Sequence, residues 1–273
     1  MVDEEPVEAF SGTVKSVKLL IGLVKSIQFK QNATVHFHEE GMTLTVMIHH
    51  LMKAVVFVKR LVFEQYRRQA DDIAPFDINL PTFLECLTMM GPTVGLMDTC
   101  RIAYQGPGYP LRLMREDREA HLSIQCNITP LESDPEGIEL MVNDLDTVQR
   151  VIIKAQWLQD AFGDLDSECN RVNMVFSTSD PCLILYGDGA NGVTSNTEYQ
   201  AGSEAFVGFE CHEPGTYSYQ YTHINSCLKA LEQASEVSLR INTEGVLCIL
   251  IRLRGTDDAY LEYTILPCQS TGA

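Results

Sequence analysis

The chain has 273 residues, of which 45% are hydrophobic and 21% charged, the composition of an ordinary globular protein able to bury a core in each of two domains. The formal net charge of −17 opposes non-specific adhesion to nucleic acid, although a local basic face can coexist with an acidic exterior. No apolar run approaches the roughly 20 residues that a membrane-spanning helix needs, which excludes that class of membrane protein.

The same unit recurs four times along the chain: an extended strand, a short amphipathic helix, and two strands closed by a polar turn. The helices are expected to begin near Ser16, Pro81, Ala155 and His223. Comparable turns close the first, third and fourth units, at residues 39–41, 179–181 and 243–245. The period of roughly 65–75 residues is too long for a solenoid repeat, so it predicts two similar domains of two units each.

The first helix carries an apolar stripe and a basic stripe on opposite sides. Apolar residues recur at i, i+3, i+4 and i+7, at Val17, Leu20, Ile21 and Val24. On a helical wheel Lys15, Lys18 and Lys25 fall together on the other side. Lysines opposite an apolar face usually form solvated surface, and contact with DNA is the alternative interpretation.

The other helices repeat this plan with different exposed charges. The fourth is expected to bury its apolar residues Ile224, Cys227, Leu228 and Leu231. It turns Lys229 outward, whereas the second and third helices expose Glu85 and Asp160. Basic character is therefore expected on the first and fourth helices only.

Between the helices the chain is rich in β-branched and aromatic residues in short runs, which predict strands. The expected strands are residues 34–38, 42–47, 54–58, 73–79, 101–105, 111–114, 148–153, 171–177, 183–187, 205–210, 217–221, 238–242, 246–253 and 261–266. Consecutive hairpins imply antiparallel sheets and an α+β fold. Residues 129–137 break both periods with two prolines, three acids and a glycine. We therefore predict domains at 1–127 and 142–273, joined by a linker at 128–141.

The cysteines indicate a reducing compartment. There are nine, an odd number, and none forms a CxxC pair. The chain opens with acidic residues and no apolar signal region. Reduced thiols and a cytosolic or nuclear protein are expected.

A glycine pattern at Gly187, Gly189 and Gly192 matches the dinucleotide-binding fingerprint. That mechanism needs a helix next, whose N-terminal amides bind the pyrophosphate. Residues 193–197 instead have the composition of a strand or loop, which favours a glycine-rich hairpin turn over a nucleotide-binding oxidoreductase.

Two further patterns could hold metal ions. A 3′→5′ exonuclease would use paired acids to bind Mg²⁺, and the available ones are Asp144 with Asp146, Asp71 with Asp72, and Asp257 with Asp258. Because these acids stand at loops and element ends, solvated turns are the preferred interpretation. His36 and His38 share one strand face, but no third ligand follows at a supporting spacing. No metal, cofactor or catalytic set is predicted.

Three stretches of the chain resemble one family. The first is residues 76–80 with 83–87 and Gly91, and the second is residues 100–111, with a tyrosine-glycine-proline hairpin that is the most specific element. The third is residues 151–153 with Leu158, 161–162 and 165–166. The similarity covers nearly the whole chain. It is to eukaryotic sliding clamps of the proliferating-cell-nuclear-antigen-like superfamily, and within them to the Rad-one subunits of the checkpoint clamp called the nine-one-one complex.

The resemblance implies a sliding-clamp fold, with antiparallel sheets outside and helices lining the inner face. It implies a nuclear, non-enzymatic subunit of a ring of three different subunits around duplex or primer-template DNA. A clamp-loader ATPase complex related to replication factor C would load the ring at damage sites. The ring would then act as a platform for DNA-damage checkpoint and repair proteins.

The implied site residues form three groups. Facing the DNA we expect Lys15, Lys18, Lys25 and Lys229, with Arg150 and Lys154 near the third helix as further candidates. Ring closure is expected at edge strands 109–116 and 193–199, with Tyr109, Leu111, Leu113, Val193 and Tyr199 at the subunit interfaces. A pocket for partner peptides would be lined by Met47, Leu131, Ile265, Leu266 and Pro267, although these could equally be core and strand-end residues.

Overall fold

The computed structural model of the chain describes residues 8–69, 73–91, 99–117, 121–133, 146–165, 169–188 and 194–268. The chain divides into two compact units, one of residues 1–46 with 55–137 and the other of residues 47–54 with 138–273. Each unit is described by itself. None of the helices in the described ranges is long and apolar enough to cross a membrane. The exact domain bounds stay a prediction.

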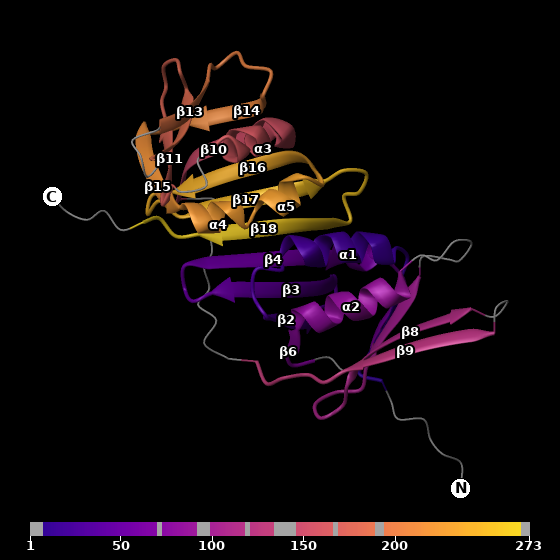
Figure 1. Cartoon of the computed structure of the whole chain (residues 1–273). Helices are drawn as coiled ribbons and strands as arrows, with labels where there is room; N and C mark the ends of the chain where they lie inside the picture. The colour runs from indigo at the N-terminus through magenta and orange to yellow at the C-terminus, as the bar shows by residue number, and fades with distance from the viewer. Residues whose placement is uncertain are drawn as a thin grey trace, which may run out of the picture. The chain divides into compact units, whose positions relative to one another are not determined.

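Within the described residues the first unit has two α-helices, a short 3-10 helix and strands of two sheets. Figure 1 shows these elements. Its elements in chain order are β1 (Phe10–Val14), α1 (Val17–Ser26), β2 (Asn32–Phe37), β3 (Gly41–Ile48), β4 (Met52–Lys59), η1 (Arg60–Val62), β5 (Phe63–Arg68), β6 (Phe76–Asn79), α2 (Leu80–Met90), β7 (Cys100–Tyr104), β8 (Leu111–Asp117) and β9 (Leu122–Ile128). One sheet has the order β5-β1-β7-β8-β9, and β4, β3, β2 and β6 are successive neighbours in the other.

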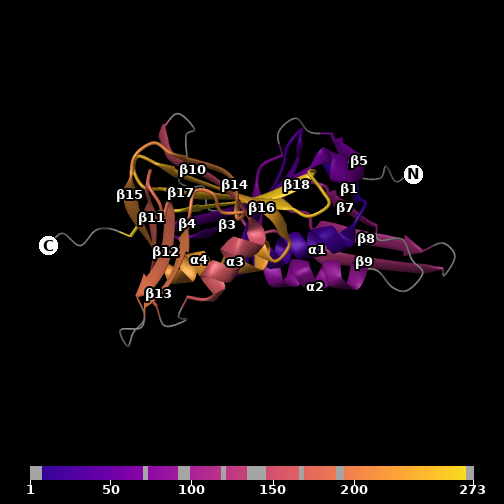
Figure 2. The same ribbon diagram turned by 90° about the horizontal axis from the view of Figure 1, so that it is seen from above.

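Each of the two α-helices of this unit begins directly after a residue whose side chain caps its N-terminus. The Ser16 side chain accepts a hydrogen bond from the Leu19 amide, and the Asn79 side chain accepts one from the Thr82 amide. Pro81 occupies the first turn of α2, where its missing amide hydrogen costs nothing. The apolar stripes are buried, and α1 and α2 pack side by side (Figure 2). The exposed residues of α1 therefore lie on the side of the helix opposite its buried apolar stripe.

The second unit repeats the arrangement. Its elements are β10 (Thr147–Lys154), α3 (Ala155–Gly163), β11 (Arg171–Phe176), β12 (Leu183–Asp188), β13 (Thr194–Tyr199), β14 (Phe206–Cys211), β15 (Gly215–Gln220), α4 (Tyr221–Asn225), α5 (Leu228–Leu231), β16 (Ala234–Asn242), β17 (Leu247–Leu253) and β18 (Ala259–Ile265). The strands follow the orders β14-β10-β16-β17-β18 and β13-β12-β11-β15. All strand pairs described in detail are antiparallel, which confirms the predicted α+β class.

The fourth helix differs from its prediction, because it is two short helices rather than one. The Ser226 amide still bonds to the Thr222 carbonyl four residues back, but the Cys227 amide bonds to Ile224, only three residues back. The Ser226 hydroxyl also donates to the Thr222 carbonyl at 2.8 Å, a local bond that competes with regular helix geometry. The helix therefore breaks between α4 and α5. Ile224, Cys227 and Leu231 are nevertheless buried as predicted.

Three strands of the first unit, β1, β5 and β9, lie outside the predicted strand ranges. The β9 sequence, Leu-Ser-Ile-Gln-Cys-Asn-Ile, alternates apolar and polar residues, which is the pattern of a strand with one buried face. The sequence therefore carries a signal for β9 that the predicted ranges do not include. This strand changes the position of the sheet edge.

Candidate assembly edges and nucleic-acid interface

The five-stranded sheet of the first unit ends at β9, which we call the β9 edge. β8 pairs with β7 on one side and with β9 on the other, so the predicted edge at residues 109–116 is wrong. Leu111 and Leu113 are 1% and 0% exposed, because they point into the core beneath β8. Tyr109, which is 50% exposed, lies in the turn before β8 rather than on an edge.

The two ends of this sheet differ in how they are protected. Edge strands usually carry charges, prolines or bulges that prevent pairing with other chains. β5, at one end, carries Glu64, Arg67 and Arg68, and its pairing with β1 contains a register shift. The β9 edge contains no charged residue, no proline and no glycine. Among the described strands, β5 therefore carries these protective features and β9 carries none of the charges or prolines.

In the second unit β13 lies at the end of the four-stranded sheet and pairs with β12, so this predicted edge agrees with the structure. Glu198 is its single charged residue. Tyr199 is buried, and its hydroxyl donates to the Trp157 carbonyl at 2.9 Å. Burial, followed by the charges of Asp160 and Asp164, raises the pKa of Tyr199 to about 12, so it remains a neutral donor. Val193 lies outside the described residues.

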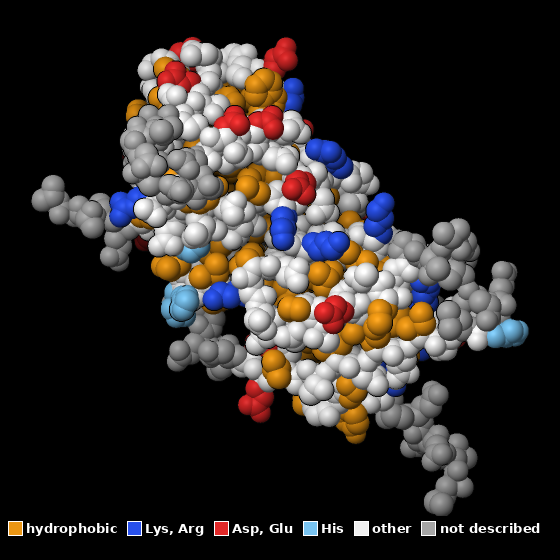
Figure 3. All heavy atoms as spheres, in the orientation of Figure 1, with side chains coloured by type: hydrophobic (Ala, Val, Ile, Leu, Met, Phe, Trp, Pro, Cys, Tyr) orange, Lys and Arg blue, Asp and Glu red, His pale blue; other side chains and the backbone are white. Residues whose placement is uncertain are grey.

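The predicted basic stripe is exposed in the first unit. Lys15, Lys18 and Lys25, which we call the α1 lysines, lie on the solvent side of α1 or just before it. The Lys15 ammonium donates to the Leu61 carbonyl at 2.7 Å. Figure 3 shows basic side chains over α1 and mainly hydrophobic ones over α2. The α1 lysines can therefore meet a phosphate backbone, whereas α2 offers little charge for such contact.

The second unit offers fewer exposed cations on its helices. Lys229 is exposed on α5, and Lys154 is exposed at the start of α3. Arg150 is misplaced in the prediction, since it alternates along β10 with the buried Val151 and Ile153 and so points to the opposite face of the sheet from α3. The rest of the exposed α3 surface includes Trp157, 45% exposed, and acidic side chains rather than basic ones.

The predicted peptide pocket is only partly available. Met47, Leu266 and Pro267 are partly exposed in the second unit, and the Leu266 amide donates to the Leu51 carbonyl at 2.9 Å. Ile265 is fully buried at the end of β18, so its assignment to the pocket is wrong and it is a core residue.

Leu131, the remaining pocket residue, belongs to the first unit. It is 45% exposed, and its backbone forms a two-hydrogen-bond bridge with Asp77 of β6.

The alternative chemistries find little support in the described residues. A strand, β13, follows the glycine pattern where nucleotide binding needs a helix, and Gly187 lies against the Cys169 sulfur, where a Cβ would approach it to 3.1 Å. Within the described ranges no group of three or more His, Cys, Asp or Glu side chains could hold a metal ion. Of the acidic pairs, Asp71, Asp72 and Asp144 lie outside the described residues.

The paired histidines have other partners. Their rings lie 3.9 Å apart between centroids, and His38 Nε2 forms a hydrogen bond with the Thr43 hydroxyl at 2.9 Å. Burial, then His36 and Arg68, lower the pKa of His38, while Glu40 acts in the opposite direction. His38 is thus a partly buried, hydrogen-bonded histidine.

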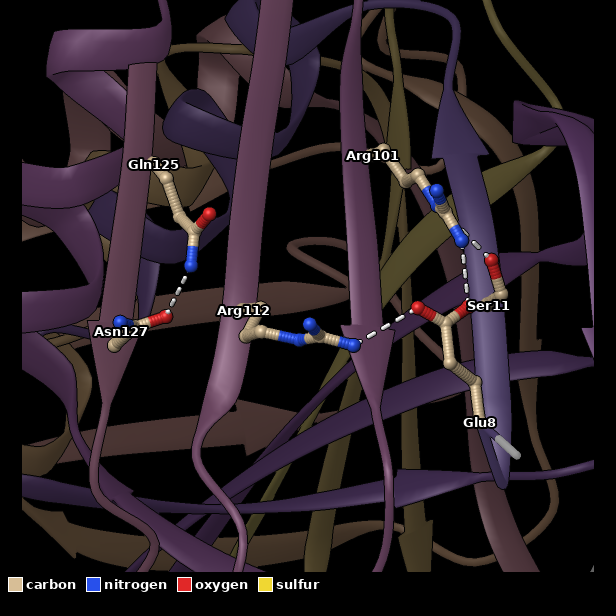
Figure 4. A network of polar contacts seen from close by, with 6 residues as sticks. All are labelled: Glu8, Ser11, Arg101, Arg112, Gln125 and Asn127. Atoms are coloured by element: carbon tan, nitrogen blue, oxygen red, sulfur yellow. Dashed lines mark hydrogen bonds and ion pairs between the residues drawn. The ribbon is translucent and has the colours of Figure 1, made fainter. Parts of the chain in front are cut away.

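Sequence reasoning missed one polar cluster on the five-stranded sheet. Arg101 and Arg112, on neighbouring strands, both bind the carboxylate of Glu8 (Figure 4). Glu8 stands 93 and 104 residues from these arginines, so no local pattern could have joined them.

The family and fold emerge from comparison with known proteins. The family model described as repair protein Rad1/Rec1/Rad17 matches residues 9–251. The chain is 26% identical to the human cell cycle checkpoint protein RAD1 over 269 residues, covering 97% of this chain and 94% of that one. It is 25% identical to the DNA damage checkpoint control protein rad1 of Schizosaccharomyces pombe, covering 94% and 86%, and 24% identical to the DNA repair protein Rad1 of Drosophila melanogaster, covering 99% and 100%.

The architecture matches a solved clamp. The crystal structure of proliferating cellular nuclear antigen from Entamoeba histolytica aligns with a TM-score of 0.76 and 13% identity, over 96% of this chain and 100% of that one. At this identity the match shows the fold alone, and it confirms the predicted sliding-clamp fold. The family match confirms the resemblance found in the sequence. The chain belongs to the Rad1/Rec1/Rad17 family of repair proteins.

Proposed function

We propose that this protein is one subunit of a nuclear ring of three different clamp subunits, which encloses duplex DNA at damage sites and recruits checkpoint and repair proteins. The observation that carries the proposal is the contrast within one sheet between the charged, bulged β5 and the uncharged β9 edge. An unprotected edge is a site for strand pairing with a neighbouring subunit. β13 offers the second edge, so two different neighbours can be joined.

DNA contact in this proposal is weak and electrostatic. A closed ring holds DNA by enclosing it, so it needs few phosphate contacts, and the α1 lysines with Lys229 can supply them. The net charge of −17 keeps the rest of the surface from adhering to DNA. Loading would require a clamp-loader ATPase of the replication-factor-C type to open the ring.

Assembly is tested at the two ends of the five-stranded sheet. Gln65 and Gln125 lie in the same transverse row, on β5 and β9 respectively, which makes them a matched pair. In native mass spectrometry of the protein purified with its bound subunits, Gln125→Lys should remove one neighbour and Gln65→Lys should remove none. A homotrimer, or loss of a neighbour from Gln65→Lys alone, would overturn the proposed ring.

DNA contact is tested by its salt dependence. Replacing the α1 lysines and Lys229 by alanine in the assembled complex should reduce the slope of log affinity against log salt by about 0.9 for each lysine that binds a phosphate in the unmodified complex. Lys53→Ala, on β4, should leave the slope unchanged. Equal slopes for the quadruple variant and the unmodified complex would exclude this face as the DNA contact.

Partner recruitment is tested at the remaining surface around Met47, Leu266 and Pro267. An apolar anchor of a partner peptide would bury against these side chains, so Leu266→Asp should weaken capture of clamp-binding peptides while the ring stays intact. Leu61→Asp is the control, because Leu61 is 64% exposed on η1. Unchanged affinity for every peptide tried would place recruitment on the other subunits.

The nuclease alternative has no specific observation in its favour, since the described acids do not converge into a metal site. Incubation of end-labelled DNA with the purified protein and Mg²⁺ should leave the 3′ ends intact. Trimming that follows the protein through purification would revive that alternative.

A further inference from the structure

The five-stranded sheet has an outer face that is polar and locally basic. Cross-strand partners share a face, so the register defines two transverse rows on it. One row runs Arg67, Ser11, Ala103, Arg112, Asn127, and the other Gln65, Thr13, Arg101, Met114, Gln125. The opposite face carries Leu111, Leu113 and Arg115, which pack toward α2. Three arginines thus stand on one face of a chain whose net charge is −17.

Two of these arginines converge on a single carboxylate. Arg101 Nη2 lies 2.6 Å from Glu8 Oε2, and Arg112 Nη2 lies 3.0 Å from Glu8 Oε1. Arg101 Nε also donates to the Ser11 hydroxyl at 3.3 Å. Figure 4 shows both guanidinium groups pointing from neighbouring strands toward Glu8. The side chains of Glu8 and Arg112 are only 18% and 25% exposed, so the carboxylate is held in a partly desolvated cradle.

The cradle contains a buried donor that the Glu8 carboxylate leaves unused. Each oxygen of Glu8 is taken by one arginine, while Arg112 Nε is buried without a hydrogen-bond partner among the described residues. A phosphate monoester carries more negative charge and three acceptor oxygens, and arginine forks match its geometry. Such a group could satisfy Arg101, Arg112 Nη2 and Arg112 Nε together.

Glu8 can leave the cradle without disturbing the sheet. The backbone beside it is fixed, because the Ala9 carbonyl accepts a hydrogen bond from the Gln69 amide at 3.0 Å and β1 begins at Phe10. Only the flexible side chain of Glu8 needs to rotate. The Glu8 carboxylate can therefore act as an internal competitor: it occupies the two arginines until an anion that binds them more strongly displaces it.

We propose that Arg101 and Arg112 form a binding site for a phosphorylated segment of a partner protein, which Glu8 occupies in the unbound state. A peptide fits better than nucleic acid, because the residues around the cradle are Ser11, Gln125 and Asn127 rather than aromatic side chains on which bases stack. Gln125 and Asn127 already form a hydrogen bond of 3.0 Å with one another and can exchange it for peptide groups. The site does not depend on whether the protein forms a ring.

The test uses fluorescent heptapeptide pools with a fixed central phosphoserine, and matched pools with serine or glutamate at that position. The full chain should bind the phosphoserine pool about tenfold more tightly than the serine pool. Arg101→Gln and Arg112→Gln should each remove this preference. Arg67→Gln is the matched control, since Arg67 lies three strands from Arg112 in the same row.

Glu8→Gln distinguishes a competitor from a structural ion pair. If Glu8 competes for the arginines, this variant should bind the phosphoserine pool several-fold more tightly than the unmodified chain. Should the arginine variants fail to fold, the Glu8→Gln result alone decides. Equal binding of the serine and phosphoserine pools would overturn the proposal, and so would weaker binding by Glu8→Gln. Tighter binding of a duplex oligonucleotide than of phosphopeptide at these arginines would assign the site to nucleic acid instead.

Discussion

Arg115 on β8 should be a main stabilising contact of the first unit. It is 7% exposed, and its Nη1 donates to the Met90 carbonyl at 2.9 Å and to the Gly91 carbonyl. These are carbonyls at the C-terminal end of α2, which has no basic residue of its own in its last turn. Arg115 therefore supplies from a neighbouring strand the positive charge and the donors that a helix C-terminus favours.

The perturbation is Arg115→Met, which keeps the aliphatic stem and removes the donors. Each hydrogen bond from a charged group contributes about 1.5–3 kcal/mol, so the gross loss is about 3–6 kcal/mol. Part of this is returned, because the variant no longer buries a guanidinium whose Nη2 has no partner in the described part of the chain. We expect a net loss of about 2 kcal/mol in the free energy of unfolding.

The assay separates the two units. Urea unfolding is followed by far-ultraviolet circular dichroism for the whole chain and by fluorescence of Trp157, the only tryptophan, for the second unit. The part of the circular dichroism transition that comes from the first unit should move to a urea concentration lower by about 1 M, while the fluorescence midpoint stays fixed. Arg67→Met, an exposed position on β5, should change stability by less than about 0.5 kcal/mol. If Arg115→Met and Arg67→Met behaved alike, Arg115 would not be holding the end of α2.

Three further outcomes follow from buried polar groups. Burial lowers the pKa of His223 below its ordinary value of 6.5, so as the pH falls the unfolded state takes up a proton before the folded state does. The free energy of unfolding should therefore fall as the pH drops below about 6.5. In urea titrations at several pH values, His223→Leu should flatten that dependence. Tyr219→Phe should cost about 1 kcal/mol by fluorescence-monitored unfolding, because its hydroxyl donates to the Gly245 carbonyl at 2.9 Å. Burial raises the pKa of the Cys227 thiol, so in Ellman's assay Cys268, which is partly exposed, should react in the native protein and Cys227 only after unfolding.

Much of the fold could be predicted from periodicity, because helices and strands here bury one face each. The helix starts at Ser16, Pro81 and Ala155 agree with the structure to within one residue. The break in the fourth helix could not be read from its apolar stripe, since Ile224, Cys227 and Leu231 keep the same burial whether the helix is continuous or not. Local hydrogen bonding decides whether the helix is continuous, whereas the apolar stripe shows only which residues are buried in the core.

The site predictions failed where they depended on which strand is outermost. The segment around Leu113 has the composition of a strand, but only pairing shows that β9 continues the sheet beyond it. The prediction for Arg150 was wrong for a related reason. Side chains alternate between the two faces of a strand, so the position of a residue along the strand decides its face, and closeness to a helix in sequence does not. Exposed cations on helices, such as Lys18 and Lys25, were predictable because one helical wheel defines both faces.

In this chain the net charge of the whole protein does not determine the charge on each edge strand. A charge of −17 would be expected to keep every edge apart from its neighbours, yet β9 contributes no charge and β5 contributes three charged residues within the same sheet. Coulomb repulsion between exposed groups is screened beyond about 10 Å at moderate salt, so distant acids cannot protect β9. Backbone pairing at an edge is decided by the residues on that edge alone. A strongly acidic protein can thus still contain a short edge strand that carries no charge.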